Sequence, residues 1–219
     1  MSILNTLSTL RAPTPGVPRQ AMVDLAFALT GEQLPLGYAF ALEEALVARL
    51  PWLAEEATAG VHPVRAPATK FGLILSRRTR LVLRIPEERV EAARALSGQR
   101  LELGEAALAV GAATPRPITP FATLSAWNVA SSADDEAAFV EDVKFQLEVM
   151  GVRAHLICGK REACSDGEHH LAGFGLALHE LSPAHSLLIQ AHGLGAGRRL
   201  GCGVFVHHKI IEGLGVDPD

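Results

Sequence analysis

The sequence predicts an α+β protein built from two tandem ferredoxin-like domains, each with the element order β, α, β, β, α, β. Two stretches, residues 21–113 and 122–219, show the same succession of strand-like and helix-like hydrophobic patterns. Between them, residues 114–121 are rich in proline, which discourages a continuous element and indicates a linker. The chain has 219 residues, of which 48% are hydrophobic and 20% charged, enough for two packed cores.

The elements of the first domain follow from its local patterns. Residues 21–29 form a compact apolar run followed by turn residues, which predicts a buried strand. Residues 37–50 carry apolar side chains at helical spacing, and Pro51 closes this amphipathic helix. The next helix, at 86–98, begins with proline and acids and ends in glycine. The remaining predicted elements are a hairpin of strands at 71–76 and 80–86 and a further strand at 100–111.

The second domain repeats this order. Residues 122–130 alternate as a strand does, and residues 132–151 have acids in the first turn of a predicted helix. The last helix, at 182–195, begins with Ser182 as its cap and Pro183 at its first position. The other predicted strands lie at 152–159, 172–181 and 201–209. Residues 1–20, with three prolines, form an N-terminal extension that we expect to be a loose arm.

Composition limits the classes of function. The formal net charge of −4 argues against nucleic-acid binding through overall basicity, although it allows a local basic patch. Three cysteines without a framework spacing, and the lack of a signal-peptide pattern, favour the cytoplasm. We expect no membrane association, because the chain has no apolar run of the ~20 residues that cross a bilayer.

The sequence indicates neither a bound metal nor a bound nucleotide. Cys158, Cys164, His169 and His170 have the residue types of a zinc site, but their spacing matches no usual zinc motif, so we predict no structural metal. The glycines near the C-terminus lie after a helix and before a strand, and no Lys-Ser or Lys-Thr pair follows them. A nucleotide-binding loop has the opposite order of elements, so we expect no nucleotide and no other cofactor.

The glycine-rich stretch at 193–206, GLGAGRRLGCGVFV, raises the question of function most directly. An interdomain hinge, a helix C-cap followed by a bulge, and a clamp on a nucleic-acid backbone all compete. A C-cap explains two of the five glycines but not the others, which flank Arg198 and Arg199. Bare backbone amides beside paired guanidinium groups suit the phosphates of a polyanion.

With this glycine-rich stretch, the sequence resembles the CRISPR-associated repeat-processing endoribonucleases, the Cas6 family within the RAMP superfamily. A glycine-rich loop between the last helix and the last strand of a tandem ferredoxin-like protein is typical of that family. The likeness extends from about Met22 to Lys209 and resembles the subfamily of myxobacterial-type type I systems. It is carried by LPLGYAFALEEAL, GVHPVR, RTRLVLRIPEE, LSGQRLELG and LSPAHSLLIQAHGLGAGRRLGCGVFV.

The resemblance implies an activity and partners. It implies metal-independent cleavage within each repeat of a CRISPR transcript, with the upstream ribose 2′-hydroxyl attacking the scissile phosphate. The products would carry a 2′,3′-cyclic phosphate and a 5′-hydroxyl. The implied partners are the stem-loop of the repeat RNA and the other subunits of a type I surveillance complex.

The catalytic candidates are Tyr38, His62 and His208. The subfamily is expected to carry a histidine early in its first helix, where this chain has Tyr38. A phenol is a poor base at neutral pH but can donate a hydrogen bond, and an ordinary packing role for Tyr38 stays open. His62 lies in a predicted accessible loop, and only one of His207 and His208 can share a strand face with the glycine loop's ligand.

The candidate RNA-binding residues are basic side chains and glycines. Solvated surface roles for the arginines remain the simpler alternative, and a purely structural RNA-binding subunit or a small-molecule enzyme are the competing functions. The candidates are Arg65, Arg77, Arg78, Arg80, Gly193, Gly195, Gly197, Arg198, Arg199, Gly201, Gly203 and Lys209.

Overall fold

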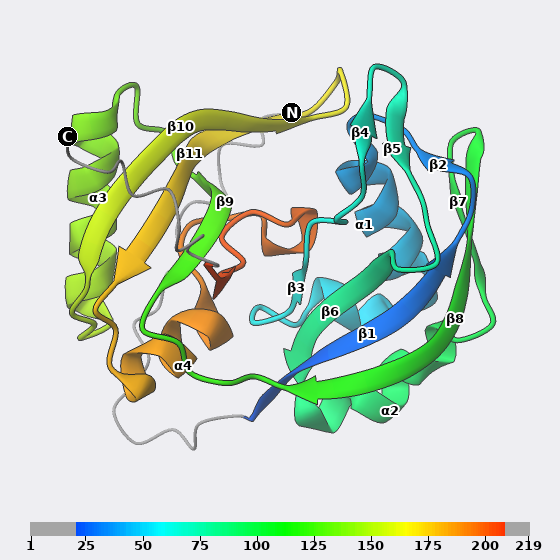
Figure 1. Cartoon of the computed structure of the whole chain (residues 1–219), viewed down its shortest axis with the longest axis horizontal. Helices are drawn as coiled ribbons and strands as arrows, with labels where there is room; N and C mark the ends of the chain where they lie inside the picture. The colour runs from blue at the N-terminus through cyan, green and yellow to red at the C-terminus, as the bar shows by residue number, and fades with distance from the viewer. Residues whose placement is uncertain (1–20, 209–219) are drawn as a thin grey trace, which may run out of the picture.

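The structure, a computed structural model, describes residues 21–208 as two α+β domains side by side (Figure 1). Lys209, one of the predicted RNA-binding residues, lies outside the described residues. The N-terminal domain stands on the right of the view and the C-terminal domain on the left. Both have the ferredoxin-like succession of elements, so the predicted fold class is confirmed.

The N-terminal domain is built on a five-stranded antiparallel sheet. Its strands follow the order β3, β6, β1, β8, β7, in which β1 lies at the centre and pairs with β6 and β8. The strands are β1 (Met22–Thr30), β3 (Gly60–Val61), β6 (Arg80–Pro86), β7 (Arg100–Leu103) and β8 (Ala106–Pro117). Helix α1 spans Tyr38–Arg49, and α2 spans Val90–Ala93 between short 3-10 turns at Glu87–Arg89 and Arg94–Leu96.

The core of this domain is formed by the alternating inward side chains of the sheet. Leu25 and Phe27 of β1 are fully buried, as are Leu46 of α1 and Leu96 beyond α2. The period-2 pattern of the strands and the apolar stripe of the helix meet in one cluster. The predicted strand at 21–29 and helix at 37–50 are therefore confirmed.

The predicted hairpin of 71–76 with 80–86 was wrong. Strand β5 (Gly72–Ile74) pairs with β2 (Gln33–Leu34) and β4 (Ala68–Thr69) in a separate three-stranded sheet, whereas β6 pairs with β1 and β3. Residues 68–74 form the β4–β5 hairpin, and β2 lies on the other side of β5, so neither partner of β5 is β6. Local apolar patterns identify strands but not their partners.

Prolines in the predicted linker do not end the preceding strand. Strand β8 continues to Pro117, with Pro115 opposite Leu25 and Pro117 opposite Val23 of β1. Strand β7 pairs only with residues 106–109, so this end of β8 has a partner on one side alone. Residues i and i+2 of a strand direct their backbone nitrogens to the same side. Pro115 and Pro117 can therefore both face the open edge, where no N–H is needed for pairing.

The C-terminal domain has a four-stranded sheet in the order β10, β11, β9, β12. Its strands are β9 (Leu124–Ala130), β10 (His155–Ser165), β11 (His170–His179) and β12 (Val206–His207). Helices α3 (Glu136–Val149) and α4 (Pro183–His192) cover one face, where Phe139, Val143 and Ile189 pack on the sheet. The opposite face of this sheet carries no helix and is turned toward the N-terminal domain (Figure 1).

The helix signals of the C-terminal domain are confirmed, but its last strand is shorter than predicted. Ser182 caps α4 by accepting a hydrogen bond from the His185 N–H, and Pro183 occupies the first position. Of the described part of the predicted strand, residues 201–208, only Val206 and His207 pair with β9. Glycines and a tight turn fill the rest, since close packing there takes precedence over sheet pairing.

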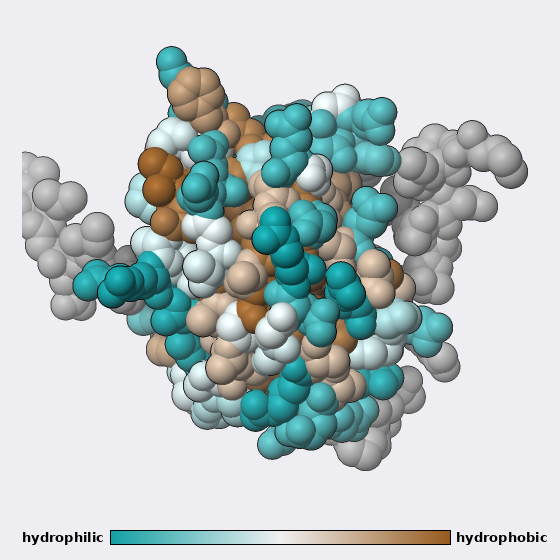
Figure 2. Space-filling view, turned by 90° about the vertical axis from the view of Figure 1, so that its right-hand side faces the viewer, coloured by the Kyte–Doolittle hydropathy of each residue, from teal (hydrophilic) through white to brown (hydrophobic). Residues whose placement is uncertain are grey.

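The outer side of the N-terminal domain is a mixed surface. Figure 2 shows hydrophilic and hydrophobic residues interspersed there, with hydrophobic ones gathered toward the upper left. The most exposed large apolar side chains of this domain are Leu36, Phe71 and Ile74, around β2 and the β4–β5 hairpin. Within residues 21–208, the structure contains no helix long and apolar enough to cross a membrane.

Candidate RNA-binding site

The glycine-rich loop follows α4 and is folded tightly on itself. All five of its glycines have positive φ, and Gly193 forms the C-cap of α4. A Cβ at Gly193 or Gly203 would overlap the loop's own backbone or Arg198. At Gly195 and Gly197 it would overlap Ala130 and Leu171 of the neighbouring strands. The glycines are therefore explained by the left-handed backbone and by close packing within the protein.

The backbone amides of this loop are largely used inside the protein. Gly195 N–H donates to Gln146 Oε1 at 3.1 Å, and Gly203 N–H donates to Asn128 O at 2.7 Å. The amides of Gly193 and Gly201 donate to Ile189 O and Arg198 O. Four of the five glycine amides are thus unavailable to an RNA phosphate.

Arg198 points into the fold rather than to solvent. Its residue is 8% exposed, and its guanidinium donates to the carbonyls of Gly203, Ala191 and Thr58 at 3.3, 3.0 and 3.1 Å. Thr58 belongs to the N-terminal domain, so this side chain joins the two domains. Burial, together with Arg84 nearby, lowers the pKa of Arg198 to about 9, and the group stays charged at neutral pH.

A second arginine crosses the domain boundary beside the first. Arg84 of β6 is 2% exposed and holds Asp24 of β1 with two hydrogen bonds of 2.7 and 2.9 Å. Its remaining nitrogen donates to the carbonyls of Phe205 and Gln190 in the C-terminal domain. This two-pronged arrangement satisfies the buried guanidinium on both sides of the boundary.

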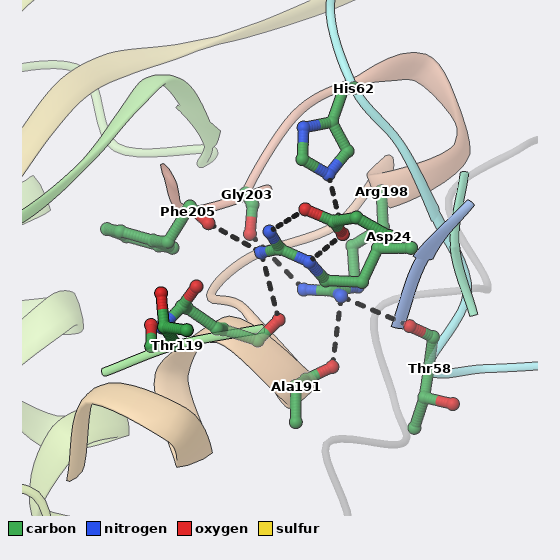
Figure 3. A network of polar contacts seen from close by, with 10 residues as sticks. Asp24, Thr58, His62, Thr119, Ala191, Arg198, Gly203 and Phe205 are labelled. Carbon is green, nitrogen blue, oxygen red and sulfur yellow. Dashed lines mark hydrogen bonds and ion pairs between the residues drawn. The ribbon is translucent and has the colours of Figure 1, made fainter. Parts of the chain in front are cut away.

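His62 completes this group, which we call the buried network (Asp24, His62, Arg84 and Arg198; Figure 3). The ring of His62 points at Asp24, with Nε2 and Oδ1 3.1 Å apart. Burial lowers the pKa of His62 despite the opposing effect of Asp24, so the neutral ring donates to the carboxylate. Burial raises the pKa of Asp24, but the bonds from His62 and Arg84 outweigh it and hold the pKa well below its usual range.

A cavity of about 450 Å³ opens between the two domains. We call it the sheet cavity, because residues from the helix-free face of the C-terminal sheet form its floor. On the N-terminal side it is bounded by the segment that follows β3. Its lining includes His62, Arg65, Ser125, Trp127, Ile157 and His208, and none of the described lining residues is acidic.

Three of the predicted site residues meet at the sheet cavity. Arg65 and His208 are exposed at its rim, and His208 Nδ1 lies 3.2 Å from Ser125 Oγ. His62 reaches it only with an edge, since its side chain is 14% exposed, so it is less accessible than the sequence predicted. His207 takes the other direction and stacks on Phe121 at a centroid distance of 4.0 Å.

Tyr38 lies elsewhere, in a groove of about 660 Å³. Its hydroxyl accepts a 2.8 Å hydrogen bond from the Val64 N–H, which supports the segment that carries His62 and Arg65. Burial raises the pKa of the Tyr38 phenol, so the group is neutral. It can donate a hydrogen bond but cannot act as a base. Three carboxylates, Glu32, Glu105 and Asp166, line this groove and disfavour an RNA phosphate.

The other predicted basic residues are distributed over the surface. Arg77 and Arg78 are exposed in the turn before β6, where Arg80 donates to the backbone carbonyls of Arg77 and Thr79. Arg199 is half-buried and pairs with Glu43 of α1 at 2.6 Å. The structure does not bring these four arginines to the sheet cavity.

Sequence reasoning missed several polar groups that the structure brings together. Asp24 and Arg84 stand inside apolar strand patterns, which give no signal for a buried ion pair across 60 residues. Asp166 and His169 form a second pair at 3.1 Å in the turn between β10 and β11, where His169 stacks on Phe40. No group of three or more potential metal ligands occurs among residues 21–208.

Comparison with solved structures gives the class of the fold. A CRISPR-associated protein Cas6 superimposes with a TM-score of 0.60 at 11% identity, over 86% of this chain and 99% of that one. A Cas6-related protein from Pyrococcus furiosus gives a TM-score of 0.60 at 14% identity, over 87% and 99% of the two chains. A RAMP protein that binds different RNA substrates gives 0.53 at 14%, over 84% and 98%. The chain has the tandem ferredoxin-like fold of these structures.

Sequence comparison then identifies the family. The Cas6 Crispr family model matches residues 23–210. The CRISPR-associated endonuclease Cas6 of Myxococcus xanthus strain DK1622 is 37% identical over 185 residues, which cover 84% of this chain and 80% of that protein. This chain belongs to the Cas6 family, so the resemblance seen in the sequence is confirmed.

Proposed function

We propose that this protein is an endoribonuclease that binds and cleaves CRISPR repeat RNA. The observation that carries the proposal is its 37% identity to the Myxococcus xanthus CRISPR-associated endonuclease over most of both chains. The sheet cavity supports it, because a cleft with cationic and imidazole groups but no carboxylate suits an RNA backbone.

The proposed chemistry is metal-independent attack of a ribose 2′-hydroxyl on the adjacent phosphate. The P–O5′ bond breaks as the new P–O2′ bond forms, which leaves a 2′,3′-cyclic phosphate and a 5′-hydroxyl. Such a step needs proton transfer at both oxygens and a cation beside the phosphate. We assign the proton transfer to the exposed imidazole of His208, which takes the proton from O2′ and delivers it to the departing O5′. We assign the phosphate contact to Arg65, and both residues lie at the rim of the sheet cavity.

Tyr38 and His62 have positioning roles in this proposal. Tyr38 fixes the Val64 amide, and Asp24 fixes the His62 ring, so both ends of the segment with Arg65 are held. Arg77, Arg78, Arg80 and Arg199 then act as secondary phosphate contacts outside the cavity. We further propose that the protein stays on the processed stem-loop as a subunit of a type I surveillance complex in the cytoplasm.

The test is single-turnover cleavage of a labelled repeat RNA in the presence of EDTA. We expect products with a 2′,3′-cyclic phosphate end, no cleavage of RNA with a 2′-deoxy residue at the scissile position, and a loss of about 10²- to 10⁴-fold for His208→Ala. His207→Ala is the matched control and keeps its rate. Cleavage that requires a divalent metal, or a normal rate for His208→Ala, contradicts the assigned chemistry.

A second function, RNA retention without efficient cleavage, is favoured by one observation. Tyr38 stands where a family histidine is expected, and its buried phenol is neutral. In that case the protein binds the repeat RNA tightly but leaves it intact in the same assay. Tyr38→His separates the two functions, because it raises the cleavage rate only if the groove at α1 is the reaction site.

A further inference from the structure

Trp127 is held on the open face of the C-terminal sheet. It is 37% exposed, although large aromatic side chains are usually well buried, and it lines the sheet cavity. Its indole N–H donates to Gly201 O at 2.9 Å, which fixes the ring against the glycine-rich loop. Its neighbours on β9, Ala126 and Asn128, are buried, as strand alternation requires. A rigid aromatic surface therefore faces the cavity.

The floor beside Trp127 lacks large side chains at two positions. Gly159 of β10 and Gly175 of β11 lie so close that a Cβ at Gly159 would meet the Gly175 backbone at 3.3 Å. The absence of side chains on these two residues leaves a shallow trough in the sheet. Ile157 borders it, is 51% exposed and extends the apolar lining.

Polar side chains also line the cavity, including the edge of His62. Arg65 supplies a permanent positive charge, while His208 and Ser125 supply hydrogen-bonding atoms. A planar apolar ligand with an attached anion matches this combination better than a peptide or a purely apolar molecule does. Sheet faces that carry aromatic side chains bind single-stranded RNA by stacking its bases, and every base has a suitable face.

We infer that the sheet cavity binds one unpaired nucleobase of the repeat RNA, stacked on Trp127, with the phosphate of that nucleotide held by Arg65. This inference rests on the proposed function. It specifies which part of the RNA binds in the cavity, namely a single-stranded nucleotide rather than the stem. The trough left by Gly159 and Gly175 admits the base, and Ile157 covers its edge.

Tryptophan fluorescence gives the direct test. The chain has two tryptophans, and a Trp52→Phe background leaves Trp127 as the reporter. Titration with repeat RNA made uncleavable by a 2′-deoxy residue at the scissile position should quench the emission, because a stacked base contacts the ring. An abasic substitution at one unpaired position should abolish the quenching, whereas abasic substitutions at the other unpaired positions should leave it.

Affinity measurements provide the second arm. Trp127→Ala should weaken binding about 5- to 150-fold, the range for one stacked base, and Trp127→Phe should retain most of the affinity. The native protein should bind the abasic RNA more weakly than the intact RNA by the same factor. Trp127→Ala should bind the two RNAs equally. Phe145→Ala, which removes an exposed aromatic ring from α3 on the other face of the sheet, is the control and should not change affinity.

The outcomes separate this inference from the proposed function. If the native protein cleaves repeat RNA but no abasic position couples to Trp127, the inference is wrong and the proposed function stands. If the native protein neither binds nor cleaves repeat RNA, both are overturned. If Trp127→Ala merely disturbs the glycine-rich loop, its affinity loss persists with every abasic RNA, which also overturns the inference.

Discussion

The buried network and the rim of the sheet cavity use the same residue types for different ends. The network holds Asp24, Arg84 and Arg198 inside the protein. Asp24 bonds Arg84 of the neighbouring strand, and both arginines bond carbonyls of the other domain. The rim presents Arg65 and His208 to solvent. His62 belongs to both, since its ring bonds Asp24 and its edge lines the cavity.

This difference indicates that burial, rather than residue type, decides whether an arginine side chain is available to contact an RNA phosphate. A guanidinium whose donors are already engaged with carbonyls cannot turn toward a phosphate without leaving those carbonyls unpaired. An exposed one can do so at little cost. Changes in the network should therefore affect stability, and changes at the rim should affect RNA binding.

Loss of Asp24 should have the largest effect on stability. Asp24→Ala leaves the buried Arg84 without its counter-charge, and we expect unfolding by urea to show a loss of about 3–5 kcal/mol. The matched control is Glu102→Ala, which breaks an ion pair with Arg100 on the surface and should cost under about 1 kcal/mol. Equal losses in the two variants would contradict the structural role of the network.

Adding a side chain at Gly203 should have the next largest effect on stability. Gly203 and Gly104 both have φ of 63°, but a Cβ at Gly203 would overlap the Leu194 carbonyl, while nothing lies within 4 Å of one at Gly104. Gly203→Ala should cost roughly 3 kcal/mol or more, and Gly104→Ala about 1–2 kcal/mol. If both glycines tolerate alanine equally in urea unfolding, close packing does not explain the loop.

Two arginines should show opposite responses. Arg198→Ala leaves three carbonyls unpaired and should lower the free energy of unfolding by about 2–3 kcal/mol, because its partners stay buried. Arg65→Ala should leave stability unchanged but weaken RNA binding and reduce the salt slope by about 1. The two variants are compared by urea unfolding and by RNA affinity at several salt concentrations; a reduced slope for Arg198→Ala at full stability would reverse the assignment.

The pH dependence of stability should be the smallest effect. His62 has a lowered pKa in the folded protein, so the unfolded chain binds more protons and stability falls as pH drops below about 6.5. Asp24, whose pKa is also lowered, keeps its contribution until the pH falls below about 4. His62→Gln can still donate to Asp24 and should flatten the curve of unfolding free energy between pH 7 and 5, while an unchanged slope would point to other histidines.

The sequence was sufficient for the fold class and for most helices. Ser182 and Pro183 mark the start of α4 because capping is a local property, and the apolar runs of β1 and β9 mark buried strands for the same reason. Pairing depends on distant residues, so the partner of β5 could not be read from its own pattern. The effect of Pro115 and Pro117 depends on the open edge beside them, which only the structure reveals.

The candidate site could be predicted only in its residue types. His62, Arg65 and His208 were singled out from loop position and chemistry, and they do lie around one cavity. Arg198 could not be separated from Arg199 in the sequence, although one is buried among carbonyls and the other pairs with Glu43. Trp127 gave no signal, because a tryptophan in an alternating strand is normally a core residue.

The shared network has a consequence for how the molecule unfolds. Residues 21–208 form two large apolar cores, one in each domain and each large enough to suggest an independent folding unit, and a small third cluster. Yet two of the four hydrogen bonds of the Arg84 guanidinium, and one of the three of Arg198, cross to the other domain. A domain that opens alone therefore leaves charged groups and carbonyls of its neighbour without these partners. The two cores should therefore melt together in one calorimetric transition, with a van't Hoff enthalpy equal to the measured heat.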